Sequence, residues 1–542
     1  MTKEKPKLEK IMLDKIMKKT RRGLTMMMGG GMMLTVLAAC SLDEKPRDQI
    51  DEEEAYVTAD ALFRNTVVTL YSYIGGSADG QGLQGTCRGV YDLQTFGSDE
   101  AMMPTRGGDW FDGGLWQAMY KHSWVAGHEL TRNAWLYLYK VITLCNRSLK
   151  TLDDHRVMAG RNYKAWTTEV RALRAIYYWY LIDLYGDVPL VVSAETQMNT
   201  VTRTPRDEVF RFCVSELEEC LPLLSVENSV REGDSYGRIT APVAYFVLAK
   251  LMINSAVYTG EADVDRYYRK CIEYCDEIES FGYQLEPDFA DNFMVHNEFS
   301  KENIFVIPMD KNLYTNQMQY LHRSHHYRHA MANGYTGENG TCATLEALRV
   351  FGYNTDDRDL RFYYTFYYDE VVDADYNVVR DRSGNPLVYY PDKVALDISG
   401  SPYVETAGAR MRKYQIDKNS AEDGCMMDND IVLFRFADVL LMRAEAKLRL
   451  DIDDRGYDDM NRVRERALME ERECTLDNLL DERMLELCWE GWRRQDMIRF
   501  GKYRSLYEGP DAVDESDGHT MLFPIPGDVI TLNPLITQNP GY

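Results

Sequence analysis

The feature that most constrains the fold is a helical repeat of apolar residues between residues 169 and 186. An apolar side chain recurs every three to four positions, at Val170, Leu173, Tyr177, Leu181 and Leu184. This period predicts an amphipathic α-helix, which Gly186 ends and Pro189 prevents from continuing. Similar stripes run over residues 431–450 and 476–500. We therefore expect a mainly α protein whose helices pack around one large core.

Two long segments have no helical period and are rich in Gly, Tyr, Trp and Asp. They span residues 75–124 and 310–424, and irregular stretches of this length in a compact protein are more often functional than idle. Within the second, Ser383-Gly384-Asn385 predicts a hairpin turn between short strands over residues 377–391. Strand is therefore a minor component. Helix pairs around residues 133–185, 207–258 and 430–467 suit a scaffold of helix repeats.

The N-terminus has the pattern of a secretory signal peptide. Basic residues between positions 15 and 22 precede an uncharged run over residues 24–39, as in exported proteins. The run ends in Leu37-Ala38-Ala39-Cys40, which resembles a bacterial lipobox. We expect a lipoprotein signal peptide over residues 1–39 and acylation of the Cys40 thiol. The alternative is an ordinary signal peptide followed by a coincidental Cys.

Acidic residues follow Cys40 at positions 43 and 44. They resemble the surface-export signal of lipoproteins from Bacteroidetes-type bacteria. The resemblance implies a lipid-anchored protein in the outer membrane that faces the cell exterior. A multiply acylated Cys would hold the body durably at the membrane, so the contact is an anchor and not a span.

The charge balance disfavours a nucleic-acid partner. The chain has 62 basic and 86 acidic residues, and without residues 1–39 the balance is 53 to 83, a net charge of −30. The phosphate-driven attraction behind nucleic-acid binding has no overall source here. Only the N-terminal end offers a concentrated apolar run, which excludes a transporter or pore with several spans.

The remaining cysteines indicate neither a disulfide framework nor a metal site. Ten of them are scattered without a CxxC pair, so no pairing can be read from their spacing. Each of two pairs would share one helix face as small core residues, Cys271 with Cys275 and Cys213 with Cys220. No phosphate-loop or dinucleotide fingerprint is apparent, and we expect no cofactor.

A series of motifs resembles one known family. Residues 169–190 resemble the signature helix of SusD/RagB-like outer-membrane lipoproteins, and further matches follow in the same order along the chain. Any one motif is weak, but five in order are specific. The other four are residues 237–244, residues 435–446, residues 481–501, and Phe523-Pro-Ile-Pro with Gln538–Tyr542 at the end.

The resemblance implies a mainly α, SusD-like fold over residues 40–542. Four TPR-like helix pairs would form the scaffold, and an irregular, loop-rich ligand-binding lobe would carry a few short strands. We place the helical scaffold at about residues 128–285 and 428–505, and the loop-rich binding regions at about residues 75–127 and 310–427.

The resemblance also implies a function and a partner. Such proteins capture oligosaccharide or polysaccharide at the cell surface and deliver it to a SusC-like TonB-dependent transporter for import. A lid that captures peptides or other nutrients for the same kind of transporter is the alternative.

A secreted glycoside hydrolase is the less favoured rival, since it needs two carboxylates about 5 to 9.5 Å apart. Asp109 with Asp112, or Glu100 with Asp99, are pairs to consider. Such pairs prove nothing in so acidic a chain, and no motif organises a catalytic site around them. We expect no enzyme activity.

The first candidate site is the loop over residues 106–116. A sugar needs aromatic platforms for its C–H face and polar groups for its hydroxyls, and glycines let the backbone approach a ligand. The alternatives are that the tryptophans are buried anchors and that the polar groups pair within the loop. The expected platforms are Trp110, Phe111 and Trp116, and the expected hydroxyl ligands are Arg106, Asp109 and Asp112.

The second candidate site is the loop over residues 314–335. Four histidines lie within eight residues, at positions 322, 325, 326 and 329, and on a continuous helix they would share one face. That spacing can bind zinc, yet no acidic residue lies between Gln319 and Ala332, and we favour hydroxyl-binding or structural roles. The expected ligand-binding residues are Tyr320, His326, Tyr327 and Tyr335, with no metal.

Charged residues in the last motif are spaced for ion pairing within a helix or with its neighbour. We expect a structural role for Glu482, Arg483, Glu486, Glu490, Arg494, Asp496 and Arg499. Arg443 departs from the family pattern, and we expect it at a surface position of its helix.

Overall fold

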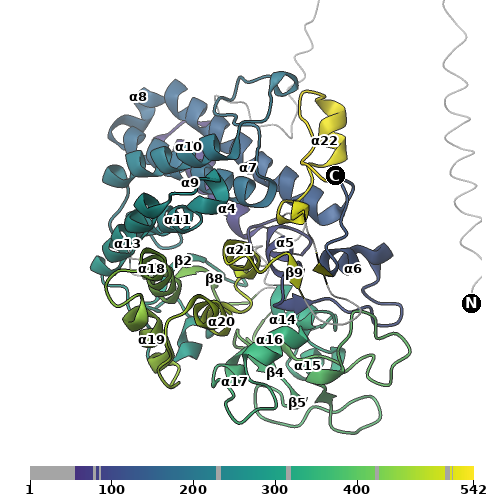
Figure 1. Cartoon of the computed structure of the whole chain (residues 1–542). Helices are drawn as coiled ribbons and strands as arrows, with labels where there is room; N and C mark the ends of the chain where they lie inside the picture. The colour runs from purple at the N-terminus through teal and green to yellow at the C-terminus, as the bar shows by residue number, and fades with distance from the viewer. Residues whose placement is uncertain are drawn as a thin grey trace, which may run out of the picture. The chain divides into compact units, whose positions relative to one another are not determined.

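A stack of long helices forms one side of the computed structural model, and each helix packs against the next (Figure 1). Among the described residues, eight helices of ten residues or more make up this stack. They are α7 (Glu129–Asp154), α9 (Tyr163–Tyr185), α10 (Arg206–Cys220), α11 (Ala241–Ile253), α13 (Asp265–Ser280), α18 (Phe436–Leu450), α19 (Tyr457–Arg466) and α20 (Leu476–Leu487).

The structure describes residues 55–76, 81–84, 87–227, 233–312, 319–420, 427–506, 513–514 and 517–542. They belong to one compact unit, Ala55–Tyr542. The expected signal peptide and Cys40 lie outside these residues. No helix in the described ranges is long and apolar enough to cross a membrane.

Helix α9 confirms the helix predicted from the apolar repeat. It ends at Tyr185, where Gly186 takes a positive φ of 73°, which glycine adopts without a Cβ penalty. The helix is buried almost all round from Thr168 to Tyr185, because α7 packs on one side of it and α10 on the other. Cys213 and Cys220 of α10 and Cys271 and Cys275 of α13 are buried, as predicted.

The stripe over residues 431–450 is not one helix. Residues Ile431–Arg435 form strand β8, which pairs antiparallel with β2 (Asn303–Ile307), and α18 begins only at Phe436. Every residue of both strands is buried. A short apolar run buried on both faces cannot be distinguished from helix by period alone, which is why the prediction was wrong here.

The stripe over residues 476–500 is also interrupted. Helix α20 ends at Leu487, and α21 (Arg493–Arg499) follows after a turn in which Trp489 and Gly491 have positive φ values of 69° and 76°. The turn releases the carbonyls of Glu486 and Cys488 from helical bonding, and both accept hydrogen bonds from the ammonium of Lys413, at 2.9 and 2.7 Å.

Between α13 and β8 the chain forms a long insertion, residues 281–430, of short elements. Helices α14–α17 and strands β4 and β5 gather at the lower end of the molecule in Figure 1. The helices are α14 (Gln319–Ser324), α15 (Tyr327–Ala332), α16 (Leu345–Val350) and α17 (Phe362–Thr365). The strands are β3 (Cys342–Ala343), β4 (Phe366–Tyr367), β5 (Asp369–Glu370), β6 (Val388–Tyr389) and β7 (Arg410–Met411).

The strands of the insertion make two-residue antiparallel ladders, β4 with β7 and β5 with β6. The predicted hairpin turn is confirmed, since the Asp381 N–H donates to the Asn385 carbonyl at 2.8 Å. Strand β3 pairs with β1 (Ala101–Met102) from the N-terminal third of the chain. This ladder brings the first candidate loop, which follows β1, beside the insertion.

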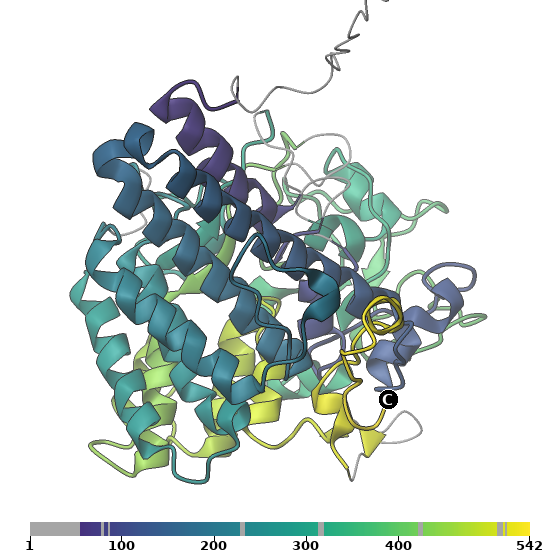
Figure 2. The same ribbon diagram turned by 90° about the horizontal axis from the view of Figure 1, so that it is seen from above.

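Several shorter elements complete the described part of the chain, and Figure 2 shows that the N-terminal helices (purple) lie along the stack. The shorter elements include α3 (Ala59–Phe63), a π-helical turn (Arg64–Val68), α4 (Thr69–Gly75), α5 (Val90–Thr95), α6 (Leu115–Tyr120), α8 (Arg156–Ala159), α12 (Ser255–Thr259), α22 (Gly527–Leu532) and the ladder of β9 (Ser505–Leu506) with β10 (Val513–Asp514).

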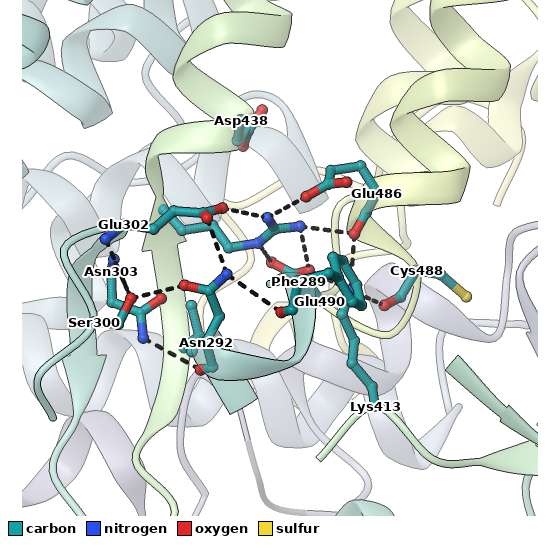
Figure 3. A network of polar contacts seen from close by, with 12 residues as sticks. Phe289, Asn292, Ser300, Glu302, Asn303, Lys413, Asp438, Glu486, Cys488 and Glu490 are labelled. Carbon is teal, nitrogen blue, oxygen red and sulfur yellow. Dashed lines mark hydrogen bonds and ion pairs between the residues drawn. The ribbon is translucent and has the colours of Figure 1, made fainter. Parts of the chain in front are cut away.

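A buried network of charges ties the insertion to the helical stack (Figure 3). Arg435 at the end of β8 bonds Glu302, Glu486 and Glu490 at 2.5 to 2.8 Å. Lys413 from the insertion also pairs with Glu490. Every side chain of this group is buried. The other charged residues of the motif also form ion pairs, so their expected structural role is confirmed: Glu482 with Arg361, Arg483 with Asp496, Arg494 with Asp183 and Arg499 with Asp496.

Arg443 is not at the surface as predicted. Its guanidinium is buried and bonds both carboxylate oxygens of Asp459, at 3.0 and 2.6 Å, with Asp276 and Glu279 at 2.7 Å each. It therefore joins α13, α18 and α19.

Candidate ligand-binding site

The loop over residues 106–116 begins with a tight turn. The Arg106 N–H donates to the Asp109 carbonyl at 2.9 Å, and the Asp109 N–H donates back at 3.2 Å. Trp110 and Asp112 then have positive φ values of 60° and 44°, which are uncommon for residues with a Cβ and occur where surrounding contacts impose them. The loop is therefore held in a defined shape by its neighbours.

Arg106 is one of these contacts and not an exposed hydroxyl ligand. Its guanidinium is buried and donates to the carbonyls of Val404 and Ala407 at 2.9 Å each. Burial, with nearby Arg410 as the second cause, lowers the pKa of Arg106 to about 9. The side chain fastens the turn to residues 404–407 of the insertion.

Trp116 belongs to the core, as the alternative interpretation had it. It is 1% exposed, its indole N–H donates to Asp112 at 2.9 Å, and its ring lies edge-on to Phe96 with centroids 5.3 Å apart. Asp112 in turn bonds Arg88 at 2.8 Å. Trp116 and Asp112 therefore pair within the structure and anchor the loop.

Trp110 lies at the surface with one edge fixed. It is half-buried, and its indole N–H donates to the Glu338 carbonyl at 2.9 Å. A Cβ at position 340 would lie 2.7 Å from the ring, so Gly340 allows the close approach. Phe111, the next residue, is 49% exposed. These two rings remain as platforms in this loop.

Tyr327 brings the two candidate loops together. Its phenol donates to the Asp109 carboxylate at 2.8 Å. Burial, together with this carboxylate, raises the pKa of Tyr327 to about 12. Tyr327 begins α15 and is half-buried, so its ring stays partly accessible beside the Asp109 carboxylate.

The histidines do not share one helix face, because α14 ends at Ser324 and α15 begins at Tyr327. The rings of His325 and His329 stack with centroids 4.3 Å apart. His325 contacts the Tyr335 hydroxyl and the Met411 carbonyl. Burial lowers the pKa of His325 to about 3. Among the residues that the structure describes, no cluster of three His, Cys, Asp or Glu side chains could hold a metal ion.

Three of the expected ligand residues in the second loop are buried. Tyr320 and Tyr335 are core residues, and the Tyr320 hydroxyl donates to Gln84 at 2.7 Å. His326 is buried with one ring nitrogen 3.1 Å from Glu405. It can act on a ligand only through that carboxylate. Residues 313–318 of this loop lie outside the described residues.

The structure adds three residues that the sequence analysis missed. The side chain of Glu405 is 47% exposed, and it contributes to the raised pKa of Tyr327 after burial and Asp109. Tyr403 and Tyr390 pack with ring centroids 4.9 Å apart and are partly exposed. No sequence motif marks these three residues. Only the hydrogen bonds from Arg106 to residues 404–407 show that they lie next to the loop. We call Asp109, Trp110, Tyr327, Tyr390, Tyr403 and Glu405 the aromatic face.

The carboxylates considered for hydrolysis are engaged in the structure. Asp99 is bonded by both ends of the Arg493 guanidinium, at 2.7 and 2.9 Å. Glu100 is buried, and burial raises its pKa to about 8. Asp109 accepts from Tyr327, and Asp112 accepts from Arg88 and Trp116.

Two family models match different parts of the chain. The model described as SusD family matches residues 301–542, and the model described as starch-binding associating with outer membrane matches residues 93–253. Starch-binding protein SusD of Bacteroides thetaiotaomicron is 26% identical over 92% of this chain and 94% of that protein. SusD-like protein P25 of Formosa agariphila is 26% identical over 68% of this chain and 70% of that protein.

Solved structures share the fold. Surface glycan-binding protein A from Bacteroides thetaiotaomicron, in complex with laminarihexaose, has a TM-score of 0.70 and 22% identity, and the match covers 89% of this chain and 99% of that chain. A laminarin-binding SusD-like protein has a TM-score of 0.66 and 20% identity over 89% of this chain and 99% of that chain.

The helix stack, the loop-rich insertion and the matched solved structures define a mainly α, SusD-like fold. The chain belongs to the SusD/RagB family. Because that family consists of non-catalytic binding proteins, the expectation of no enzyme activity is confirmed.

Proposed function

We propose that this protein binds oligosaccharide or polysaccharide on the aromatic face and delivers it to a SusC-like TonB-dependent transporter. The observation that carries the proposal is the hydrogen bond from Tyr327 to Asp109, because it joins the two loops and holds the Tyr327 phenol at the residue that precedes Trp110 in the chain. The relatives named for starch, laminarin and laminarihexaose support a glycan as the ligand.

The chemistry of the face suits a sugar. Partly exposed rings of Trp110 and Tyr327 offer flat apolar surfaces to the C–H face of a pyranose, each adding about 0.5–1.5 kcal/mol by analogy with aromatic pairs. Asp109 and Glu405 are acceptors for hydroxyl donors. His326, bonded to Glu405, keeps that carboxylate in place.

The cell-surface location is part of the same proposal. The mature protein begins at Cys40, is lipid-anchored in the outer membrane and faces the exterior. The family description that mentions association with the outer membrane supports this location. Replacement of Cys40 by Ala is expected to release the protein from membranes, which fractionation and palmitate labelling measure.

Electrophoresis of the mature chain without its lipid-bearing Cys40, residues 41–542, in gels that contain single polysaccharides tests the binding. We expect retardation by at least one polymer, loss of retardation in Trp110→Ala, and no change in Tyr267→Ala on the scaffold. Tyr267 serves as the control because it is a partly exposed aromatic residue of α13, outside the aromatic face. Binding of peptides by the protein, with no retardation by any glycan, would instead support the nutrient alternative.

A further inference from the structure

A second group of aromatic rings surrounds Arg358 in the insertion. The guanidinium carbon lies 5.0 to 5.7 Å from the centroids of four rings, within the range of cation–π contact. The rings belong to Tyr353, Phe362, Tyr363 and Tyr368. We call these four residues and Arg358 the Arg358 cluster.

The cluster has a buried base and an accessible rim. Phe362 is fully buried and packs edge-on against Phe351. Tyr353 stacks on Phe362 at a centroid distance of 5.8 Å and an interplanar angle of 17°. Tyr363 is 40% exposed, and Tyr353 and Tyr368 are half-buried. The base therefore holds three tyrosines, each of which keeps part of its side chain at the surface.

In the described part of the chain, Arg358 is held by aromatic rings and two long hydrogen bonds and not by a carboxylate. It contacts the hydroxyls of Tyr363 and Tyr368 at 3.3 and 3.5 Å, and within the described ranges it makes no ion pair and its Nε has no hydrogen-bond partner. Arg361, three residues later, instead bonds Asp359, Glu482 and Glu486. The Arg358 guanidinium instead positions the Tyr363 and Tyr368 hydroxyls, which accept from it and can donate their own O–H to a sugar hydroxyl.

An acceptor lies beside the same rings. The exposed carboxylate of Asp369 contributes, after burial, to the raised pKa values of Tyr353 and Tyr368. Platforms, donors and an acceptor therefore occur together, which is the combination found on the aromatic face.

The cluster adjoins the aromatic face through Lys393. The pKa of Lys393 is raised mainly by its hydrogen bond to Asp392, and the phenols of Tyr403 and Tyr353 add to the effect. The geometry agrees: the Lys393 N–H donates to the carbonyl of Tyr390 in the aromatic face at 3.2 Å. The turn Pro391–Lys393 also contacts α16, which ends at Val350, three residues before Tyr353. Tyr403 belongs to the aromatic face and Tyr353 to the Arg358 cluster, so a long ligand can reach from one to the other over Lys393, which is exposed.

We propose that the Arg358 cluster is a second carbohydrate-contact site, which holds a polysaccharide chain that already lies on the aromatic face. The inference rests on the proposed function and extends it to the length of the ligand. Two contacts in one molecule make the second binding event intramolecular, so they strengthen binding of long chains that span both and leave short chains unaffected.

The test compares polymers with hexasaccharides on the mature chain. The probes are laminarin with laminarihexaose and amylose with maltohexaose, and calorimetry measures affinity for whichever pair the wild type binds. In Tyr363→Ala/Tyr368→Ala we expect about a tenfold loss of polymer affinity and hexasaccharide affinity within about twofold of wild type. Arg358→Lys, which keeps the charge and loses the planar fork, is expected to lose part of the polymer affinity.

Tyr267→Ala is the matched control, since Arg266 lies over that ring at 4.3 Å on the scaffold, and it should change neither affinity. Far-ultraviolet circular dichroism and thermal unfolding verify the fold of each variant. If the double variant unfolds, the polymer affinity of Arg358→Lys tests the second site instead.

Unchanged polymer affinity in the folded variants would overturn the second site. An equal loss for polymer and hexasaccharide would also overturn it, because the cluster would then act through the aromatic face. A failure of the proposed function can be distinguished from these results, because the wild type itself would then bind none of the four probes.

Discussion

The phenol of Tyr327 donates a 2.8 Å hydrogen bond to the carboxylate of Asp109, 218 residues earlier in the chain. The bond closes a surface that starts at the loop after β1 and continues through α15 into residues 403–405. It predicts that Asp109 and Tyr327 act on a ligand as one unit.

A double-mutant cycle measures this coupling. Tyr327→Phe keeps the ring and removes the donor, and Asp109→Ala removes the acceptor. We expect each single change to weaken binding of the retained oligosaccharide. The double variant should lose no more affinity than the single variant with the larger loss, which corresponds to a coupling energy of about 0.5–1.5 kcal/mol. Calorimetry of the four proteins measures it, and strictly additive losses would show that the two residues act separately.

Trp116 and Phe111 are expected to differ in their effect on stability. Trp116→Ala removes a fully buried ring and should lower the free energy of unfolding by about 3–5 kcal/mol. Phe111→Ala removes a half-exposed ring and should change it by less than about 1 kcal/mol. Urea unfolding followed by circular dichroism measures both. Similar losses in the two variants would contradict the placement of Trp116 in the core.

The Arg435 network is expected to make the protein sensitive to acid. Burial opposes ionisation of Glu486, but Arg466, Arg435 and Arg361 hold its pKa well below the usual value. In the unfolded chain a Glu titrates at about 4.3, so the stabilisation is present above that pH and is lost as the pH falls through the lower pKa of the folded state.

Arg435→Met removes one cationic partner from three buried carboxylates, those of Glu302, Glu486 and Glu490, and should lower the free energy of unfolding at pH 7 by about 3–5 kcal/mol. Urea titrations of wild type and variant at pH 7 and pH 4 measure it, with Arg211→Met at an exposed ion pair of α10 as the control. Equal stability of Arg435→Met and the control would contradict the account.

His325 is expected to weaken the fold at mildly acidic pH. Its folded pKa of about 3 lies below the ordinary value of 6.5, so between these pH values the unfolded chain binds more protons and stability falls as the pH falls, by up to about 1.4 kcal/mol per pH unit. His325→Asn removes this proton-binding site. The difference in unfolding free energy between pH 7 and pH 5 should be smaller in the variant than in wild type, and an equal difference would refute the assignment.

Local signals in the sequence predicted the long helices well. The end of α9 follows from Gly186 and Pro189, both within four residues of the last turn. β8 was missed because its five residues are buried on both faces, and burial on both faces removes the alternation that identifies a strand.

The candidate site was predictable only in part. The aromatic residues of the loop over residues 106–116 could be found from composition, but the choice between Trp110 and Trp116 depends on packing against Phe96 and Gly340. Glu405 and Tyr403 depend on the bonds from Arg106 to carbonyls about 300 residues away. A single sequence carries no local signal for such contacts.

A crystal structure of the mature chain with the oligosaccharide that it retains most strongly tests the central claim most directly. We expect a sugar ring in van der Waals contact with Trp110 or Tyr327 and a sugar hydroxyl that forms a hydrogen bond with Asp109 or Glu405. A bound sugar that touches none of the residues of the aromatic face would contradict it.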